Sequence, residues 1–388
     1  MTIKVAVGLS SDLDAVAAVD DAAAEAREGL DGAACDLCLL FVAAPYLDYA
    51  EEVVAVAQDA LRPGALIGCG AGGVVGARRE IEEGPGVVVW ALSAPEASFE
   101  VRHLTSQALP GAIALGGLPD DPGEYGDAMF VLADPHTFSA EALLEHLNEA
   151  RPGMPALGGL ASAQGPDASS LFLDGEVVSE GAVTCSVSGL PLVPCVSQGA
   201  TPVGPEMAVT EAEGNVITGL ASKPALERLR EAIDALTPRE RLLAGHGLLL
   251  GVVIDENQPE YERGDFLVRP IVGADPDEGS ITVAERVRVG QTVRLHVRDG
   301  VSADVDLREA LAAQTRALGP DGAAGALVFT CNGRGAHMFS MPDHDANAVA
   351  DVLGAPAGGF FCAGEIGPVG GRNFLHGFTA TIAVLPRA

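Results

Sequence analysis

The sequence predicts a mixed α/β fold with two domains, built from duplicated strand–helix–strand–hairpin units. Short apolar runs such as VVVW at 87–90 are bounded by Gly, Pro or charged residues, as buried strands are. Segments with helical spacing and helix-end signals alternate with these runs, which is typical of α/β proteins. The same succession restarts near residue 128, and a chain of 388 residues is long enough for two domains.

The first unit alternates strands with two predicted helices. One helix begins at the capping residue Asp12 and stops at Gly29, and the next stops before a Pro-Gly pair. Two strands with no helix between them follow, which indicates antiparallel pairing in a mixed sheet. The predicted strands are 3–10, 35–45, 65–76, 84–94 and 97–105, and the predicted helices are 12–29 and 45–61.

The second unit repeats this order. A strand at 128–135 precedes an amphipathic helix at 138–149, which Ser139 is placed to cap. A strand at 154–163 then enters a glycine turn, and residues 170–189 form a hairpin that turns at Asp174-Gly175. We therefore expect residues 1–200 to form one α/β domain with an internal duplication.

Residues 201–388 are expected to form the second domain, with a β-rich insert at about 205–300. The alternation in TVRLHVRD indicates a strand with one buried face. After the insert the first theme returns with helices at 304–318 and 343–354 and strands at 325–333, 358–371 and 373–385.

Three strand ends are rich in glycine and resemble one another. They lie at 65–76, 154–165 and 358–371, and we expect duplicated units to bring them to one place. Ligands of open α/β sheets bind at the carboxyl ends of the strands. The sequence therefore predicts a binding site where these ends meet.

The charge of the chain limits its partners. The formal net charge is −31, with 23 Lys and Arg against 54 Asp and Glu, so nucleic acids and anionic membranes are disfavoured partners. No apolar run is long enough to cross a bilayer, and the first residues do not form a signal peptide. We expect a cytoplasmic protein. Seven cysteines, an odd number without an export signal, do not predict a disulfide framework.

The stretch CNGRG at 331–335 places polar side chains directly after a buried strand. Its two glycines let the backbone turn sharply, so that Arg334 projects from a tight loop. A guanidinium suits a carboxylate or a phosphate, which makes Arg334 a candidate ligand anchor. The alternative interpretation is an internal pair between Arg334 and a carboxylate such as Glu365.

The stretch CAGEIGPVGGRNFLHG at 362–377 adds a carboxylate at a strand end, where an unpaired charge is costly unless it faces a ligand. Together with Arg334 it would form a pocket of mixed charge that suits a zwitterion such as an amino acid. The alternative is a hairpin with solvated charges. The candidate ligand-binding residues are Cys331, Asn332, Gly333, Arg334, Glu365, Arg372, Asn373, His376, Gly68, Cys69, Gly158 and Gly159.

Other residue patterns could form catalytic or metal sites. Cys331 and Cys362 lie at strand ends and are candidate nucleophiles, although a catalytic cysteine needs a base nearby and buried packing cysteines are commoner. Asp343 and Asp345 flank His344, and we interpret these carboxylates as helix-cap and helix-dipole residues. The sequence predicts no metal site and no cofactor.

The pieces GCGAGGVVG, PALGGLASA, GALVFTCNGRGAHMF, GGFFCAGEIGPVGG and NFLHGFTATIAV resemble the FIST family, named for F-box and intracellular signal transduction proteins. The first half resembles the FIST N domain and the second half the FIST C domain. The resemblance implies a sensory module that binds small ligands such as amino acids. This chain has no room for a fused output domain, so it would act with a separate signalling partner.

Three functional hypotheses follow. The first is a stand-alone small-molecule sensor whose ligand is an amino acid or a small carboxylate, with an unidentified signalling protein as its partner. The second is a cysteine-dependent enzyme that acts on an amide or a thioester-like substrate. The third is a scaffold that binds another protein through a sheet edge. The sequence favours a binding protein over an enzyme.

Overall fold

The computed structural model describes residues 2–165, 169–245, 247–261 and 263–387. The chain divides into two compact units: Met1–Val196 joins Leu307–Ala388 in the first, and Ser197–Asp306 forms the second. Within the described residues, no helix is both long enough and apolar enough to cross a membrane.

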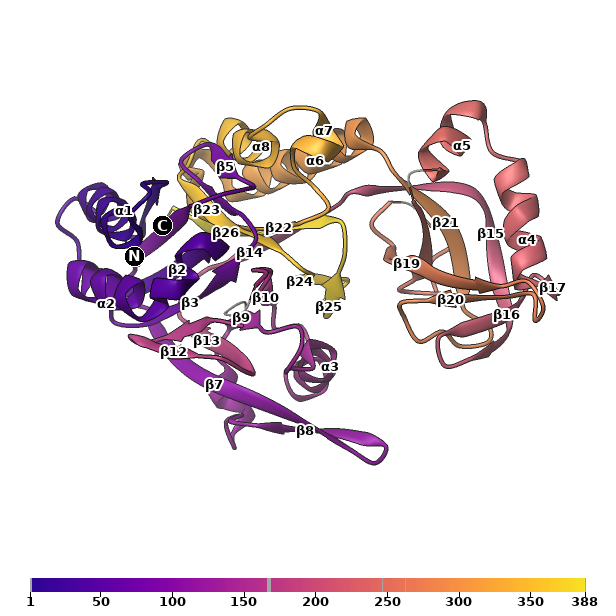
Figure 1. Ribbon diagram of the computed structural model, residues 1–388, viewed down its shortest axis with the longest axis horizontal. Helices are drawn as coiled ribbons and strands as arrows, with labels where there is room; N and C mark the ends of the chain where they lie inside the picture. The colour runs from indigo at the N-terminus through magenta and orange to yellow at the C-terminus, as the bar shows by residue number, and fades with distance from the viewer. Residues whose placement is uncertain (1, 166–168, 246, 262, 388) are drawn as a thin grey trace. The chain divides into compact units, whose positions relative to one another are not determined.

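Three β-α-β repeats build the first compact unit (Figure 1). In each repeat two parallel strands flank a helix, and an antiparallel strand lies beside the first of them. This confirms the mixed α/β fold and its duplicated units. The repeats are β2(Leu37–Ala43), α2(Ala50–Leu61), β3(Leu66–Ala71) with β6(Val87–Ser93); β9(Ala128–Ala133), α3(Ala140–Ala150), β10(Ala156–Leu160) with β13(Ala182–Ser188); and β22(Ala323–Cys331), α8(His344–Leu353), β23(Ala357–Cys362) with β26(Thr379–Pro386).

Each repeat passes its following hairpin to the sheet of another repeat. The hairpin after β3 pairs with β23, the hairpin after β10 pairs with β3, and the hairpin after β23 pairs with β10. This cyclic exchange joins the three sheets where the second strands end. The hairpins are β4(Val74–Gly76) with β5(Arg79–Ile81), β11(Leu171–Leu173) with β12(Glu176–Val178), and β24(Glu365–Val369) with β25(Arg372–His376).

A close backbone approach recurs at one glycine in the second strand of each repeat. A Cβ built on Gly68 would lie 2.1 Å from the Leu40 carbonyl oxygen on the neighbouring parallel strand. The corresponding distance is 1.9 Å for Gly158 and 1.7 Å for Gly359. Real Cβ atoms do not come so close to a backbone atom, so these strand pairs require glycine.

The remaining elements extend and cover the three sheets. β1(Lys4–Ser10) pairs with β6, β7(Ser98–Leu109) pairs with both β13 and β8(Ala112–Gly116), and β14(Val193–Gln198) lies beside β26. The covering helices are α1(Ala15–Gly29), α6(Gly300–Leu318) and α7(Ala336–Phe339), with the 3₁₀ turns η1(Ala44–Tyr49), η2(Pro122–Tyr125) and η3(Gly319–Asp321).

The largest apolar core contains residues from all three sheets. Phe41 stacks on Phe360 with ring centroids 4.8 Å apart, and both rings meet Phe329 edge-on. Phe130 from β9 and Trp90 from β6 belong to the same cluster. Helices α1 and α2 cover the outer face of the first sheet, α3 that of the second, and α6 and α8 that of the third. The inner faces are therefore held together by apolar contact, which fixes the strand ends relative to one another.

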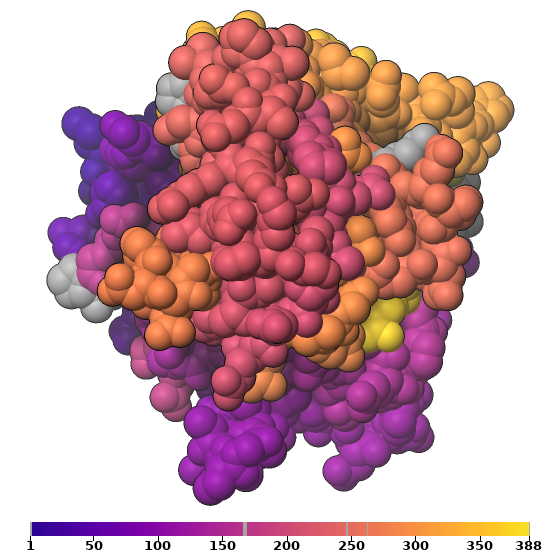
Figure 2. All heavy atoms as spheres, turned by 90° about the vertical axis from the view of Figure 1, so that its right-hand side faces the viewer, coloured from indigo at the N-terminus to yellow at the C-terminus, as the bar shows by residue number. Residues whose placement is uncertain are grey.

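The second compact unit is an antiparallel sheet with two helices and its own core (Figure 2, red to orange). Because β15 also pairs with β16, six of its strands form a closed ring. The elements are β15(Ala200–Glu213), β16(Val216–Leu220), β17(Lys223–Pro224), α4(Ala225–Asp234), α5(Pro238–Ala244), β18(Leu248–Val253), β19(Phe266–Asp275), β20(Ser280–Val283) and β21(Thr292–Arg298).

Candidate functional site

The glycine-rich strand ends of the three repeats meet, as their resemblance predicts. The backbone N–H of Phe361 donates to the Gly73 carbonyl, and that of Ser162 donates to the Gly70 carbonyl. The Ser162 hydroxyl accepts the Gly72 N–H at 2.8 Å and donates to the Phe361 carbonyl. In the third repeat, Arg334 follows the end of β22 and Glu365 follows the end of β23.

Arg334 is completely buried and is held by Asp345. Its Nε lies 2.7 Å from Asp345 Oδ2, and its Nη2 lies 2.8 Å from Oδ1, which is the two-pronged geometry that a guanidinium prefers. Asp345 also accepts from the Thr330 hydroxyl at 2.6 Å and lies 2.9 Å from His344 Nδ1. Arg334 thus forms the internal ion pair of the alternative interpretation, but its partner is Asp345 and not Glu365.

The pKa of Asp345 reflects its ion pair with Arg334. Burial alone would raise the pKa of the carboxyl, but the Arg334 charge and hydrogen bonds outweigh burial and hold the pKa below its usual range. Asp345 therefore stays ionised, and Arg334 keeps two of its three nitrogens on it.

Phe339 from α7 covers this ion pair. Its ring centroid is 5.0 Å from Arg334 Cζ, within cation–π range. The same ring stacks on His344 with an interplanar angle of 7°. One aromatic side chain therefore packs against both the guanidinium and the imidazole.

Glu365 is a further buried acidic residue of the site. Its Oε2 accepts the Thr379 N–H at 3.0 Å and the Thr379 hydroxyl at 2.7 Å. Burial raises the pKa of this carboxyl to about 7, and the Thr379 bonds and the Arg334 charge only partly oppose that rise. Glu365 therefore holds its proton to a higher pH than an ordinary glutamate does.

Two polar atoms of these residues have no hydrogen-bond partner among the described residues. They are Arg334 Nη1 and Glu365 Oε1, and both are buried. The two side chains make no direct ion pair, yet their charges interact, because Arg334 lowers the pKa of Glu365. Cys331 lies near both, because the Glu365 charge helps to raise the pKa of the Cys331 thiol and Cys331 helps to raise the pKa of Arg334.

The cysteines do not have the properties of nucleophiles. All seven are buried, and burial raises the pKa of the Cys331 and Cys362 thiols well above the usual value. The nearby Glu365 charge raises both values further. Because the thiolate is the reactive form, the structure argues against Cys331 and Cys362 as catalytic residues.

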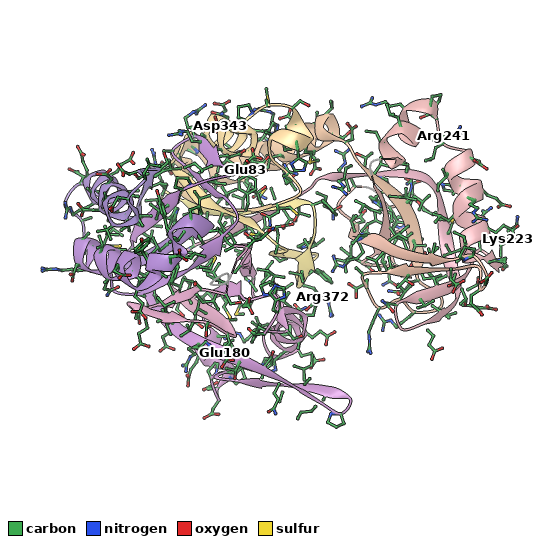
Figure 3. All side chains as sticks on the ribbon, viewed as in Figure 1. Glu83, Glu180, Lys223, Arg241, Asp343 and Arg372 are labelled. Atoms are coloured by element: carbon green, nitrogen blue, oxygen red, sulfur yellow. The ribbon has the colours of Figure 1, made fainter. Side chains whose placement is uncertain are left out.

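Three of the predicted binding residues lie on the β24–β25 hairpin but point elsewhere. Arg372 is exposed near the hairpin turn (Figure 3), and so does not join the buried cluster. The Asn373 side chain binds the Ala156 N–H and the Met154 carbonyl, which ties β25 to β10. His376 pairs with Glu365 in strand register, but its Nε2 lies 3.0 Å from the Gly367 carbonyl. Asn373 and His376 therefore support the fold.

The remaining predicted positions divide between packing and the strand ends. Gly68, Cys69 and Gly158 lie within the sheets, where the glycines permit the close strand approach described above. Gly159 pairs with Glu365, and Cys362 Sγ fills the space a Cβ there would need.

The two residues before Arg334 lie at the surface of the cluster. Asn332 is exposed, and its backbone N–H donates to Cys362. Gly333 lies against the Phe378 ring and donates its N–H to Cys331 Sγ at 3.3 Å. Their side chains or backbone therefore shape the strand end without entering the ion pair.

Sequence reasoning missed the residues that partner the buried charges. Asp345 was interpreted as a helix-dipole residue, and Thr379 received no role. Asp343 occupies the N-cap position of α8, but its carboxylate accepts the Glu80 N–H at 2.6 Å and makes no cap bond to the helix, which corrects the capping prediction. A buried arginine signals that a carboxylate must lie nearby, but the signal does not say which one.

Two glutamates from the β4–β5 hairpin region also reach this region. Glu80 Oε1 accepts the Ala346 N–H, and Glu82 Oε1 accepts the Ala336 N–H, both at 2.8 Å. More than 250 residues separate these partners in sequence. Despite the many carboxylates, no three His, Cys, Asp or Glu side chains in the described part of the chain are placed to hold one metal ion.

Comparison with known proteins gives consistent matches along most of the chain. Residues 36–223 match the model of the FIST N domain, and residues 225–368 match that of the FIST C domain. The chain is 42% identical over 385 residues to the uncharacterized protein Mb0898c of Mycobacterium bovis, covering 98% of each protein. It is also 42% identical over 384 residues to the uncharacterized protein Rv0628c of Mycobacterium tuberculosis, covering 98% of this chain and 99% of the relative. The boundary between the two domain models falls inside the second compact unit.

Proposed function

The chain belongs to the FIST family, whose domains are associated with sensory and signal-transduction roles, and on this premise we propose that it is a small-molecule sensor. The ligand is an amino acid or a small carboxylate, and it occupies the region between Arg334 and Glu365. A sensor needs an output, so the proposal includes a signalling protein as partner.

The observation that carries the proposal is the pair of unsatisfied atoms, Arg334 Nη1 and Glu365 Oε1. A buried donor or acceptor without a partner costs free energy, so native proteins retain few of them, and a ligand or water is a usual explanation. One of these atoms is a donor on a cation and the other is an acceptor on an acid. A molecule with a carboxylate and an amine or hydroxyl would satisfy both.

Asp345 limits how Arg334 can hold such a ligand. Because Nε and Nη2 are bound to Asp345, only Nη1 remains for a ligand carboxylate. The contact is then a single charge-assisted hydrogen bond rather than a two-pronged one. A site of this kind selects ligands by the distance between their carboxylate and their amine or hydroxyl group, more than by their negative charge.

The cysteine-enzyme hypothesis is not carried forward, because burial keeps the candidate thiols protonated. No particular contact favours the scaffold hypothesis over the sensor.

The test is a thermal-shift screen of the twenty amino acids and of acetate, lactate and succinate. A ligand at a hundredfold its Kd adds about 2.7 kcal/mol to the free energy of unfolding, which a melting curve resolves. We expect at least one compound to raise the Tm of the wild type. Glu365→Gln should abolish that shift, because the side chain keeps its shape and an oxygen for Thr379, but an NH₂ group that cannot accept a hydrogen bond replaces Oε1.

Arg334→Ala is unsuitable as the test variant, since it would leave Asp345 buried without its partner at a cost of about 3–5 kcal/mol. Arg372→Gln is the matched control, because it removes an exposed arginine from the same hairpin as Glu365. The proposal is contradicted if no compound stabilises the folded wild type, or if Glu365→Gln retains the full shift.

A further inference from the structure

Arg334 and Glu365 are closed off from solvent. The exposed fraction of each is 0%, so nothing can reach Arg334 Nη1 unless some part of the chain moves. The candidate for that movement is the segment 335–343, which lies between β22 and α8 and contains α7 with Phe339. Phe339 is the side chain of this segment that covers the Arg334 guanidinium.

The segment has little apolar anchoring. No side chain from 336 to 343 is buried, and Met341 is 53% exposed. Two of its residues, Ser340 and Asp343, have left-handed backbone angles with φ near 57° and 60°, which are unfavourable for residues other than glycine. Segments with few buried apolar contacts open locally at low free energy.

Polar contacts with the β4–β5 hairpin region hold both ends of the segment. At the first end, Glu82 Oε1 accepts the Ala336 N–H at 2.8 Å. A Cβ on Gly335 would lie 2.4 Å from Glu82 Oε2, so only glycine lets this carboxylate come so close. At the second end, Glu80 exchanges bonds with both sides of the α8 start: its N–H donates to Asp343 Oδ1, and its Oε1 accepts the Ala346 N–H.

We propose that residues 335–343 form a lid over the buried Arg334 site and that Glu82 and Glu80 are positioning residues that hold this lid closed. Opening carries Phe339 away from Arg334 and exposes the guanidinium. Only the identity of the ligand that the lid admits rests on the proposed function. The opening itself is a property of the chain without ligand. The glutamates come from the first repeat through the hairpin exchange, so one repeat controls access to a site in another.

The test is hydrogen exchange by mass spectrometry on the full chain without added ligand. Glu82→Ala removes the acceptor of the Ala336 N–H, and amides of 335–343 should exchange at least tenfold faster, with β22 and β23 unchanged. Glu82→Gln should restore most of the protection, because a carboxamide oxygen still accepts a hydrogen bond. Glu83→Ala is the matched control, because Glu83 is the adjacent exposed glutamate (Figure 3) and should leave exchange as in the wild type.

Two outcomes overturn the lid. In one, exchange of 335–343 is the same in Glu82→Ala and the wild type. In the other, exchange rises equally in β22 and β23, which would make Glu82 a stabiliser of the whole compact unit. The ligand screen is independent of this test. A stabilising ligand together with unchanged exchange would support the binding site and exclude the lid. Faster local exchange without any stabilising compound would support the lid and exclude the binding site.

Discussion

At the scale of single residues, the third repeat keeps two carboxyl groups of opposite behaviour near one arginine. Asp345 bonds Arg334 directly and stays ionised, whereas Glu365 is bonded by Thr379 and has a pKa raised to about 7. Both are buried, so the difference comes from where the guanidinium points and not from exposure. The raised group is therefore the one whose protonation changes near neutral pH.

We predict that the stability of the protein falls as pH rises through 7. The folded Glu365 has a pKa of about 7 against 4.5 for the ordinary carboxyl, so the folded chain binds this proton more tightly than the unfolded chain. Its contribution is complete below about pH 4.5 and is lost as pH passes the folded value. The full effect is on the order of 3 kcal/mol.

Urea denaturation at pH 5, 6, 7 and 8 measures this slope, and Glu365→Gln should reduce it. Part of the slope should remain in the variant, because burial also raises the pKa of Glu80 to about 7. An identical slope in Glu365→Gln and the wild type would show that Glu365 is ionised in the folded chain at these pH values.

The sequence could predict that the ends of β22 and β23 carry polar residues, but it could not pair them. Arg334 had to meet a carboxylate, because it directly follows a buried strand and its charge is permanent. Whether that carboxylate is Glu365 or Asp345 depends on the path of 335–343, which holds two left-handed residues that no periodicity signals. Thr379 was equally hidden, since it reads as one more alternating residue of a last strand.

At the scale of elements, the three β-α-β repeats share one structural requirement. Gly68, Gly158 and Gly359 each face a backbone carbonyl of the preceding parallel strand at a distance that excludes a Cβ. These glycines of the strand ends are therefore needed, first of all, for the close pairing of the parallel strands. Arg334 and Glu365, the residues of the proposed site, lie just beyond them.

We predict that Gly359→Ala destabilises the first compact unit by about 3 kcal/mol or more, because the new Cβ forces β22 and β23 apart. Gly377→Ala is the control, since nothing lies within 4 Å of a Cβ at that position and its change should be small. Chemical denaturation of both variants measures the difference. Equal stability of the two would mean that the strands adjust without cost.

Elements and their order follow from sequence patterns, but the partners of the hairpins do not. The strand at 358–362 and the glycine turn after it are visible as an apolar run and a cluster of small residues. That the next strand, β24, pairs with β10 rather than within its own repeat depends on contacts made by the folded sheets. Local sequence patterns cannot predict a strand partner about 200 residues away in the chain.

At the scale of the whole molecule, each compact unit has an apolar core of its own. Leu250 belongs to the core of residues 197–306, and Leu327 belongs to the large core of the three sheets. A core of its own is what allows a segment to unfold as a separate cooperative unit.

We therefore predict two transitions in differential scanning calorimetry. Leu250→Ala should lower the temperature of one transition and Leu327→Ala that of the other, each through a loss of about 2–5 kcal/mol in its own core. A single transition that both variants lower together would show that the two compact units unfold as one.

The hairpin exchange between repeats limits how the gene for such a protein can be divided. β24, in the FIST C match, completes the sheet of β10 in the FIST N match, and β4, in the FIST N match, completes the sheet of β23 in the FIST C match. A gene cut between the two matches would leave both products with bare sheet edges, which are prone to aggregation. We therefore expect the two matched segments to fold only when one gene encodes both.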